Sequence, residues 1–203
     1  MPDGDSEFDE AAELERRTLW VLLAINGAMF LLEAVVGLLA DTAGVLADSL
    51  DMFADASVYA IALYAVGRSV HIQRRAAGLS GVAQIALGVG VLVEVARRFL
   101  MGSEPVSAVM IGVSFIALAA NLTCLALISK HREGGIHMRA SWIFSANDVI
   151  ANVGVIVSGA LVMLLDSRLP DLVIGAVIAV VVIRGGVNIL REVGREGSHH
   201  TPA

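Results

Sequence analysis

The sequence has little of what a water-soluble protein needs. Only 17% of its 203 residues are charged and 57% are hydrophobic, whereas a soluble domain has roughly a quarter charged and under half apolar residues. Such a chain carries more apolar side chain than a soluble fold of this size could bury. Cys124 is the single cysteine, so an internal disulfide framework is excluded. An integral membrane protein remains.

The few charges are unevenly placed. Residues 1–17 hold seven acidic side chains against Arg16 and Arg17, and the rest of the chain is nearly balanced. That balance leaves no basic face for nucleic acid. The acidic start also lacks the positive n-region of a signal peptide. We therefore expect residues 1–17 to be an uncleaved, acidic cytoplasmic tail.

Six apolar runs are each long enough to cross a bilayer, for which a helix needs about 20 residues. They cover about residues 18–40, 44–66, 77–95, 106–128, 140–165 and 172–190. Arg184 interrupts the sixth, and frequent glycine suits close helix packing in lipid. The sequence predicts an all-α integral membrane bundle of six transmembrane helices over residues 18–193, with a short cytoplasmic tail over residues 194–203.

The orientation follows from Lys and Arg in the short loops. With both termini on one side, that side carries ten of these residues, and the other carries Arg97, Arg98 and Arg168. Both termini are therefore expected in the cytoplasm. Thirteen of the 14 basic residues are arginine, which favours a GC-rich bacterial host and the inner membrane.

Ionisable residues inside apolar runs are costly and are functional candidates by default. The list is short: Glu33, Asp48, Asp51, Asp55, Glu94 and Asp148. Asp48, Asp51 and Asp55 are spaced i, i+3, i+7, so they share one helix face. Three clustered carboxylates repel each other unless protons, a cation or basic partners neutralise them. A bound divalent cation, replaced by protons when it leaves, is the simplest solution.

The fifth run repeats part of this pattern. Asp51-Met-Phe-Ala-Asp55 matches Asp148-Val-Ile-Ala-Asn152, and small residues such as Gly154 lie beside both pairs. Small residues let helices approach closely, so we expect the second and fifth helices to face each other. Carboxylate and amide oxygens at one point suit a divalent metal. Polar residues that serve only helix packing are the alternative, above all for Asn147 and Asn152.

These residues resemble the cation diffusion facilitator (cation efflux) family of divalent metal/proton antiporters. The resemblance lies in three stretches: Phe30-Leu-Leu-Glu33 to Asp41, Leu46-Ala-Asp48-Ser-Leu-Asp51-Met-Phe-Ala-Asp55, and Met138 to Asn147-Asp148 and Gly154. It covers about residues 18–193 and implies the six-helix order. With only about ten residues after the sixth run, we expect a short form without the cytoplasmic domain that many members add.

In that family each motif helix supplies a His or Asp and then an Asp four residues later. The resemblance assigns Asp51 and Asp55 to these positions in the second helix and Asp148 to the second position in the fifth. The first position there is Phe144, which cannot bind metal. Asn147, Asn152, Asp48 or water would complete the shell. Without histidine the site is harder than usual for zinc, which shifts the expected cargo toward Mn, Fe or Co without excluding Zn or Cd.

Other polar residues are expected to play lesser parts. We interpret the histidines, which are His71, His131, His137, His199 and His200, as solvated loop and tail residues that could collect metal at the entrance. Glu33 and Glu94 are either proton relays or structural groups that bond neighbouring helices. Asn26 and Asn121 are expected to bond between helices, and Cys124 to pack.

We expect no enzymatic activity and no permanent cofactor. The predicted partners are divalent metal ions, protons and the lipid bilayer, with a homodimer through the membrane helices. Three alternatives stay open: a proton-coupled exporter of organic cations, an intramembrane hydrolase with two aspartates, and a membrane metal sensor or subunit that does not transport. The low aromatic content (5%) speaks against the first, and a third carboxylate on the same face is not needed for the second.

Overall fold

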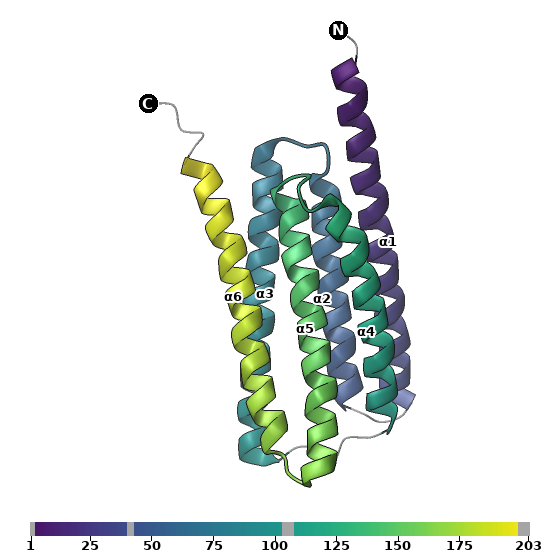
Figure 1. The fold of residues 1–203 in the computed structure, drawn as a ribbon, viewed down its shortest axis with the longest axis vertical. Helices are drawn as coiled ribbons and strands as arrows, with labels where there is room; N and C mark the ends of the chain where they lie inside the picture. The colour runs from purple at the N-terminus through teal and green to yellow at the C-terminus, as the bar shows by residue number, and fades with distance from the viewer. Residues whose placement is uncertain (1–2, 40–42, 103–107, 199–203) are drawn as a thin grey trace.

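The computed structural model describes residues 3–39, 43–102 and 108–198. Its elements are α1 (Asp3–Leu39), α2 (Ala43–Ala65), α3 (Val70–Met101), α4 (Ala108–Ile128), the short 3₁₀ helix η1 (Ser129–His131), α5 (Ile136–Leu165) and α6 (Leu169–Ser198). The six long helices run up and down the molecule, and both termini lie at the same end (Figure 1). The predicted all-α bundle of six helices is confirmed.

Within the described residues, five helices are long and apolar enough to cross a membrane. Their candidate spans are Asp9–Leu39, Val70–Met101, Ile111–His131, Ile136–Leu165 and Leu169–Arg195. Helix α2 is not among these five, because every stretch of 18 residues within it contains three charged side chains, those of Asp48, Asp51 and Asp55. Arg184 does not interrupt α6, which runs past it as one helix with this side chain exposed. The chain is therefore a multi-pass membrane protein whose second helix has unusual polarity.

Four helices, which are α1, α3, α5 and α6, extend beyond their predicted limits. Helix α1 begins at Asp3, so the acidic stretch continues the first span as helix. Helix α3 extends from Val70 to Met101, beyond the predicted 77–95, because charged residues at both of its ends still favour helix. Asp41, His199 and His200 lie outside the described residues.

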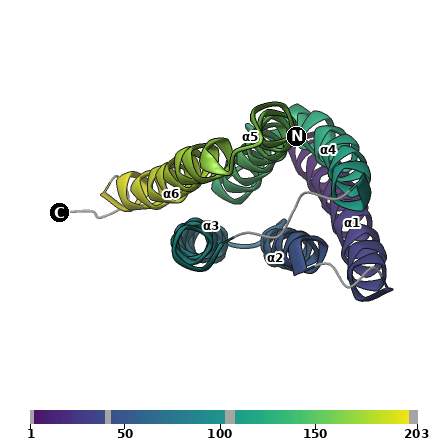
Figure 2. The same cartoon turned by 90° about the horizontal axis from the view of Figure 1, so that it is seen from below.

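Seen along the bundle, α4, α5 and α6 with α1 form a curved row, and α2 and α3 lie across from it (Figure 2). Helix α3 packs most extensively on α6, and α1 on α2. Glycine makes the first contact close: a Cβ on Gly88 would lie 2.6 Å from Ile183 Cγ1, and one on Gly186 would lie 2.7 Å from the Gly81 carbonyl oxygen. The predicted role of glycine in close packing is confirmed for this pair.

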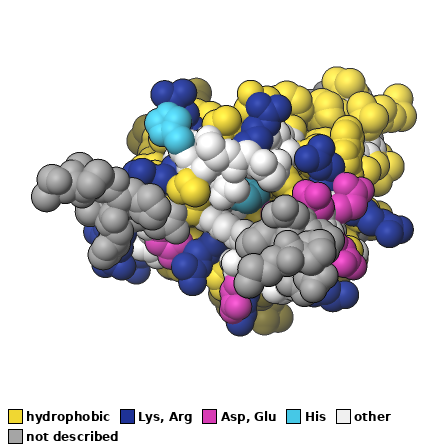
Figure 3. All heavy atoms as spheres, turned by 90° about the horizontal axis from the view of Figure 1, so that it is seen from above, with side chains coloured by type: hydrophobic (Ala, Val, Ile, Leu, Met, Phe, Trp, Pro, Cys, Tyr) yellow, Lys and Arg dark blue, Asp and Glu magenta, His cyan; other side chains and the backbone are white. Residues whose placement is uncertain are grey.

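The largest buried apolar cluster lies in the other half of the molecule. It joins α1, α2, α4 and α5 through Leu19, Leu22, Tyr59, Ala62, Val66, Cys124, Ile128 and Met138. These residues come from the parts of their helices nearest the end that carries the termini. Basic side chains surround that end (Figure 3), as expected for a cytoplasmic face. The apolar cluster therefore separates the middle of the bundle from this end.

Candidate metal site

Helix α2 presents its three aspartates as a ladder of increasing burial. Asp48 and Asp51 are half-buried, whereas Asp55 is completely buried at 0% exposure. With a rise of 1.5 Å per residue, the ladder covers about 10 Å along the helix axis. Because α2 runs toward the end that carries the termini, Asp55 is the aspartate deepest in the bundle.

Helix α5 brings a fourth aspartate to this ladder. Asp148 is buried, and α5 contacts α2. Its carboxyl group interacts directly with that of Asp55, and Asp51 acts electrostatically on both. The structure thus places Asp51, Asp55 and Asp148, which the sequence pattern singled out on two different helices, within electrostatic reach of one another.

The central carboxyl groups lack hydrogen-bond donors. Among the described residues, no donor reaches either side-chain oxygen of Asp55 or Oδ2 of Asp148. An ionised carboxylate buried without a partner is strongly destabilising. Two such groups that face each other require a proton or a cation between them. A proton or a cation at the α2–α5 contact would remove this cost.

Glu33 of α1 also belongs to this group, although the sequence did not decide between a proton relay and a structural bond. It is 0% exposed, and Asp48 and Asp51 act on it electrostatically. Neither of its carboxyl oxygens has a hydrogen-bond partner within the described part of the chain. A structural bond to a neighbouring helix is therefore not seen, and a proton-relay role for Glu33 stays a prediction.

The amides predicted to complete the shell are less well placed. Asn147 and Asn152 are both buried on α5. The amide nitrogen of Asn147, however, occupies the space that a Cβ on Gly185 would need, so this side chain lies against α6. Gly154 likewise faces Ile178 of α6, so the expectation that it lets α5 approach α2 was wrong. For Asn152, metal binding stays a prediction.

No metal cage is preformed in this conformation. Across residues 3–39, 43–102 and 108–198, no three His, Cys, Asp or Glu side chains are arranged to hold one metal ion. Phe144, one turn before Asp148, is fully buried at 0% exposure and contributes an apolar wall. A bound ion therefore requires water, an amide oxygen or a shift of α2 against α5 in addition to the aspartates.

Asn26 bonds between helices as predicted, whereas among the described residues no partner reaches the side-chain nitrogen of Asn121. Asn26 of α1 donates from Nδ2 to the Leu22 carbonyl oxygen at 3.0 Å and contacts Cys124 Sγ of α4 at 3.4 Å. Asn26 therefore joins α1 to α4, and Cys124 has a polar contact besides its packing. Cys124 also acts electrostatically on Asp55, which places this contact beside the site.

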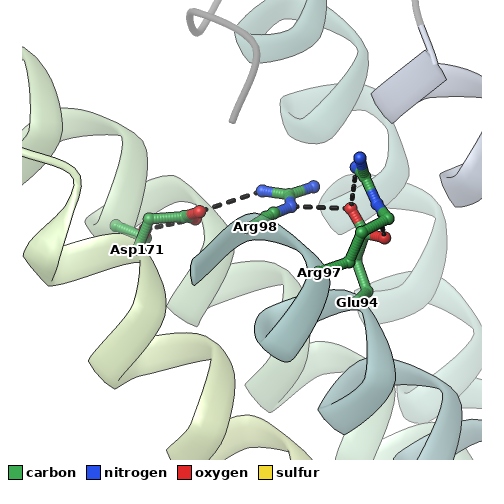
Figure 4. Close-up of polar contacts among 5 residues, drawn as sticks. Glu94, Arg97, Arg98 and Asp171 are labelled. Atoms are coloured by element: carbon green, nitrogen blue, oxygen red, sulfur yellow. Dashed lines mark hydrogen bonds and ion pairs between the residues drawn. The ribbon is translucent and has the colours of Figure 1, made fainter. Parts of the chain in front are cut away.

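Glu94 proves to be a structural group. It accepts hydrogen bonds from Arg97 at 2.7 Å and from Arg98 at 2.8 Å, and Arg98 donates to Asp171 at 2.9 Å (Figure 4). Ser158 of α5 donates to the same aspartate at 3.0 Å. The network ties α3, α5 and α6 together at the end opposite the termini. A satisfied ion pair of this kind has no need of a transported proton.

One histidine contradicts the sequence-based interpretation. His71 is exposed and His131 is half-buried, but His137 lies in the first turn of α5 with only 1% of its surface exposed. Sequence distance from the apolar run suggested a solvated loop, whereas α5 begins earlier and turns this residue inward. Only the structure shows that the His137 imidazole is buried and, in the described part of the chain, has no hydrogen-bond partner.

The chain matches the cation efflux transmembrane domain over residues 19–196. It is 25% identical over 190 residues to the zinc transporter ZitB of Yersinia pseudotuberculosis, covering 87% of this chain and 61% of that protein. It is 23% identical over 119 residues to a cadmium, cobalt and zinc/H(+)-K(+) antiporter of Bacillus velezensis, covering 58% of this chain and 38% of that protein.

The chain thus spans between 38% and 61% of the length of these two relatives. The domain match, in contrast, covers nearly all of the described helices, including α2 and α5 with their aspartates. On that match, the chain belongs to the cation efflux family.

Proposed function

We propose that the protein is a divalent metal cation/proton antiporter that exports a transition metal from the cytoplasm through the α2–α5 site. Asp55 and Asp148 are the central ligands, Asp51 is the third, and Asp48, Asn152, Asn147 or water completes the shell. One observation carries the proposal: two buried carboxyl groups from facing helices interact directly and have no donors among the described residues. A cation or proton is the partner that removes the cost of their burial.

The ligand chemistry narrows the cargo. An all-oxygen set favours the harder divalent ions, whereas the names of the relatives include zinc, cadmium and cobalt. We therefore propose Zn, Co, Cd, Mn or Fe as the transported ion. The metal is substrate in this proposal, and the protein holds no permanent cofactor.

Transport follows from competition for one set of oxygens. Metal binding neutralises the carboxylates and lets the bundle change conformation, and protons on the far side displace the metal. The apolar cluster around Leu19 and Tyr59 closes the path toward the end that carries the termini. Half-buried Asp48 and Asp51 lead to the opposite end. The described conformation is thus closed toward the cytoplasm, and the metal would enter after these helices part.

The membrane setting is part of the proposal. Both termini lie in the cytoplasm, the membrane is a bacterial inner membrane, and the helices pair two copies into a homodimer. Residues 18–193 form the transport domain, and residues 1–17 and 194–203 flank it. The basic rim at the end that carries the termini supports this orientation (Figure 3).

The test is metal flux into proteoliposomes under an imposed pH gradient, with Zn, Cd, Co, Mn, Fe and Ni offered in turn. We expect one or two metals to move in the wild type and none in Asp148→Ala. Asn121→Ala, which changes another buried polar residue, serves as a matched control that keeps all carboxylates. Equal flux in Asp148→Ala would contradict the proposal. Metal binding without metal flux would identify a sensor. Flux of organic cations alone would identify an exporter of organic cations.

A further inference from the structure

Glu15 of α1 and His137 of α5 meet at the end of the bundle that carries the termini. His137 Nε2 lies 3.7 Å from Glu15 Oε2, which is too far for a hydrogen bond. Both side chains are buried, at 8% and 1% residue exposure. In the described part of the chain, neither imidazole nitrogen has a hydrogen-bond partner. An acid and an imidazole are therefore held close together with a gap between them.

The loop before α5 is shaped around these two groups. The Glu15 carboxylate occupies the place that a Cβ on Gly134 would take, and the main-chain carbonyl oxygen of His131 lies 3.2 Å from that same point. Gln73 Oε1 and His137 Nδ1 lie 3.1 Å and 3.2 Å from the position of a Cβ on Gly135. Side chains at either glycine would push the polar groups apart.

We infer that Glu15 and His137 form a second divalent-cation site, in which water completes the shell. Two ligands at 2.0–2.1 Å in a tetrahedral shell lie about 3.4 Å apart, so the observed gap needs only a small closure. Nε2 is the imidazole nitrogen that lies beside Glu15, and with the proton on Nδ1 its lone pair is available to a metal.

The chemistry favours a borderline metal such as Zn²⁺ or Co²⁺. One imidazole and one carboxylate, with carbonyl oxygens or water in the other positions, is a ligand set that zinc accepts. The pair has one charged ligand, Glu15, and Gly134 beside it is exposed, so a bound ion can exchange with solvent. A weak, exchangeable site suits an ion that arrives and leaves, and it differs from the all-oxygen site deeper in the bundle.

The site is separate from the α2–α5 carboxylates. His137 and Asp148 are eleven residues apart on α5, or about 16 Å along the helix axis. The apolar cluster that includes Met138 and Leu19 lies between the two levels. Only the idea that the bound ion is also the cargo rests on the proposed function, because cation binding by Glu15 and His137 can be measured without transport.

The experiment uses the full chain in lipid nanodiscs, in a background that removes other candidate ligands. Asp55→Asn and Asp148→Asn disable the central site, and His71, His199 and His200 become Gln. We expect this background to bind about one Zn²⁺ per chain by calorimetry. His137→Gln and Gly134→Ala should each weaken binding by about tenfold or more, because one removes a ligand and the other displaces Glu15.

Two matched controls keep the ligands in place. His131→Gln removes a neighbouring imidazole but keeps its main-chain carbonyl, and Gly78→Ala adds a methyl group where nothing lies within 4 Å. Both should bind zinc as the background does. Absence of binding in the background, or unchanged binding in His137→Gln and Gly134→Ala, would overturn the inference. If the wild type transports no metal but the background variant still binds zinc, only the proposed function is refuted.

X-ray absorption of the zinc-loaded background provides a readout that needs no further substitution. We expect imidazole nitrogen together with oxygen in the first shell, and we expect Glu15→Gln to lower the zinc occupancy. A shell of oxygen alone would overturn the inference even if the Gly134 or His137 variants failed to fold.

Discussion

The two halves of the bundle treat buried polar groups in opposite ways. Around the α3–α6 pair, Glu94, Arg98 and Asp171 bond one another, and glycines bring the backbones together. Around α1, α2 and α5, Glu33 and Asp55 are buried with no hydrogen-bond partner among the described residues. Charged groups with hydrogen-bond partners hold helices in place, whereas buried carboxyl groups without partners need a proton or a ligand. We therefore interpret the first half as a fixed frame and propose that the second half holds the transport site.

The largest effect is expected from Asp55→Ala. This change removes the most deeply buried carboxylate and should lower metal flux roughly a hundredfold or more, since an ion site loses a central charged ligand. Glu94→Ala, which removes a carboxylate from the frame, should retain most of the flux. Proteoliposome uptake under a pH gradient measures both, and normal flux in Asp55→Ala would erase the distinction between the halves.

Glu33→Gln should have the next largest effect. Glutamine keeps the shape but cannot carry a proton, so flux should fall about tenfold, while metal binding at equilibrium changes less. The pH dependence of flux should flatten in this variant. A Glu33→Gln protein with an unchanged pH profile would show that Glu33 belongs to the frame after all.

Gly88→Ala should weaken the frame and spare the site. The added methyl group would lie 2.6 Å from Ile183 Cγ1 and 3.2 Å from the Ala179 carbonyl oxygen. We expect a stability loss of about 1–3 kcal/mol, seen as a lower melting temperature in detergent. Gly90→Ala on the same helix, with nothing within 4 Å, is the control. Equal melting of the two variants would argue against close α3–α6 packing.

The smallest effect is expected from Arg98→Ala. Its ion pairs are partly exposed, so the loss of stability should be about 1 kcal/mol. Arg184→Ala, which removes an exposed arginine of α6, should cost nothing. Thermal melting distinguishes them, and a loss of flux with unchanged melting in Arg98→Ala would assign the Glu94 network to transport.

The sequence was sufficient to predict the helices and to single out the buried aspartates. Long apolar runs report membrane helices directly, and the period of the helix places Asp48, Asp51 and Asp55 on one face. Contacts between helices were harder to predict, because a single sequence gives no distances between helices. Gly154 was expected to face α2 but packs on α6, and Glu33 was not recognised as a neighbour of Asp48 and Asp51.

Burial at helix ends was also beyond the sequence. Glu15 lies in the acidic first segment and His137 follows the charged loop over 130–133, so the sequence pattern placed both in water. The early start of α5 and the Gly134–Gly135 turn bury them instead. Charge patterns predict which end of a bundle is exposed to solvent, but they do not predict which polar side chain at that end is buried.

Proton release on zinc binding tests the central claim most directly, since metal and protons must compete for the α2–α5 carboxylates. Calorimetry in two buffers of different ionisation enthalpy gives the number of protons released per zinc bound. We expect the wild type to release more protons than the Asp55→Asn, Asp148→Asn double variant, which keeps the Glu15–His137 site. Equal release from the two proteins would contradict antiport through these aspartates.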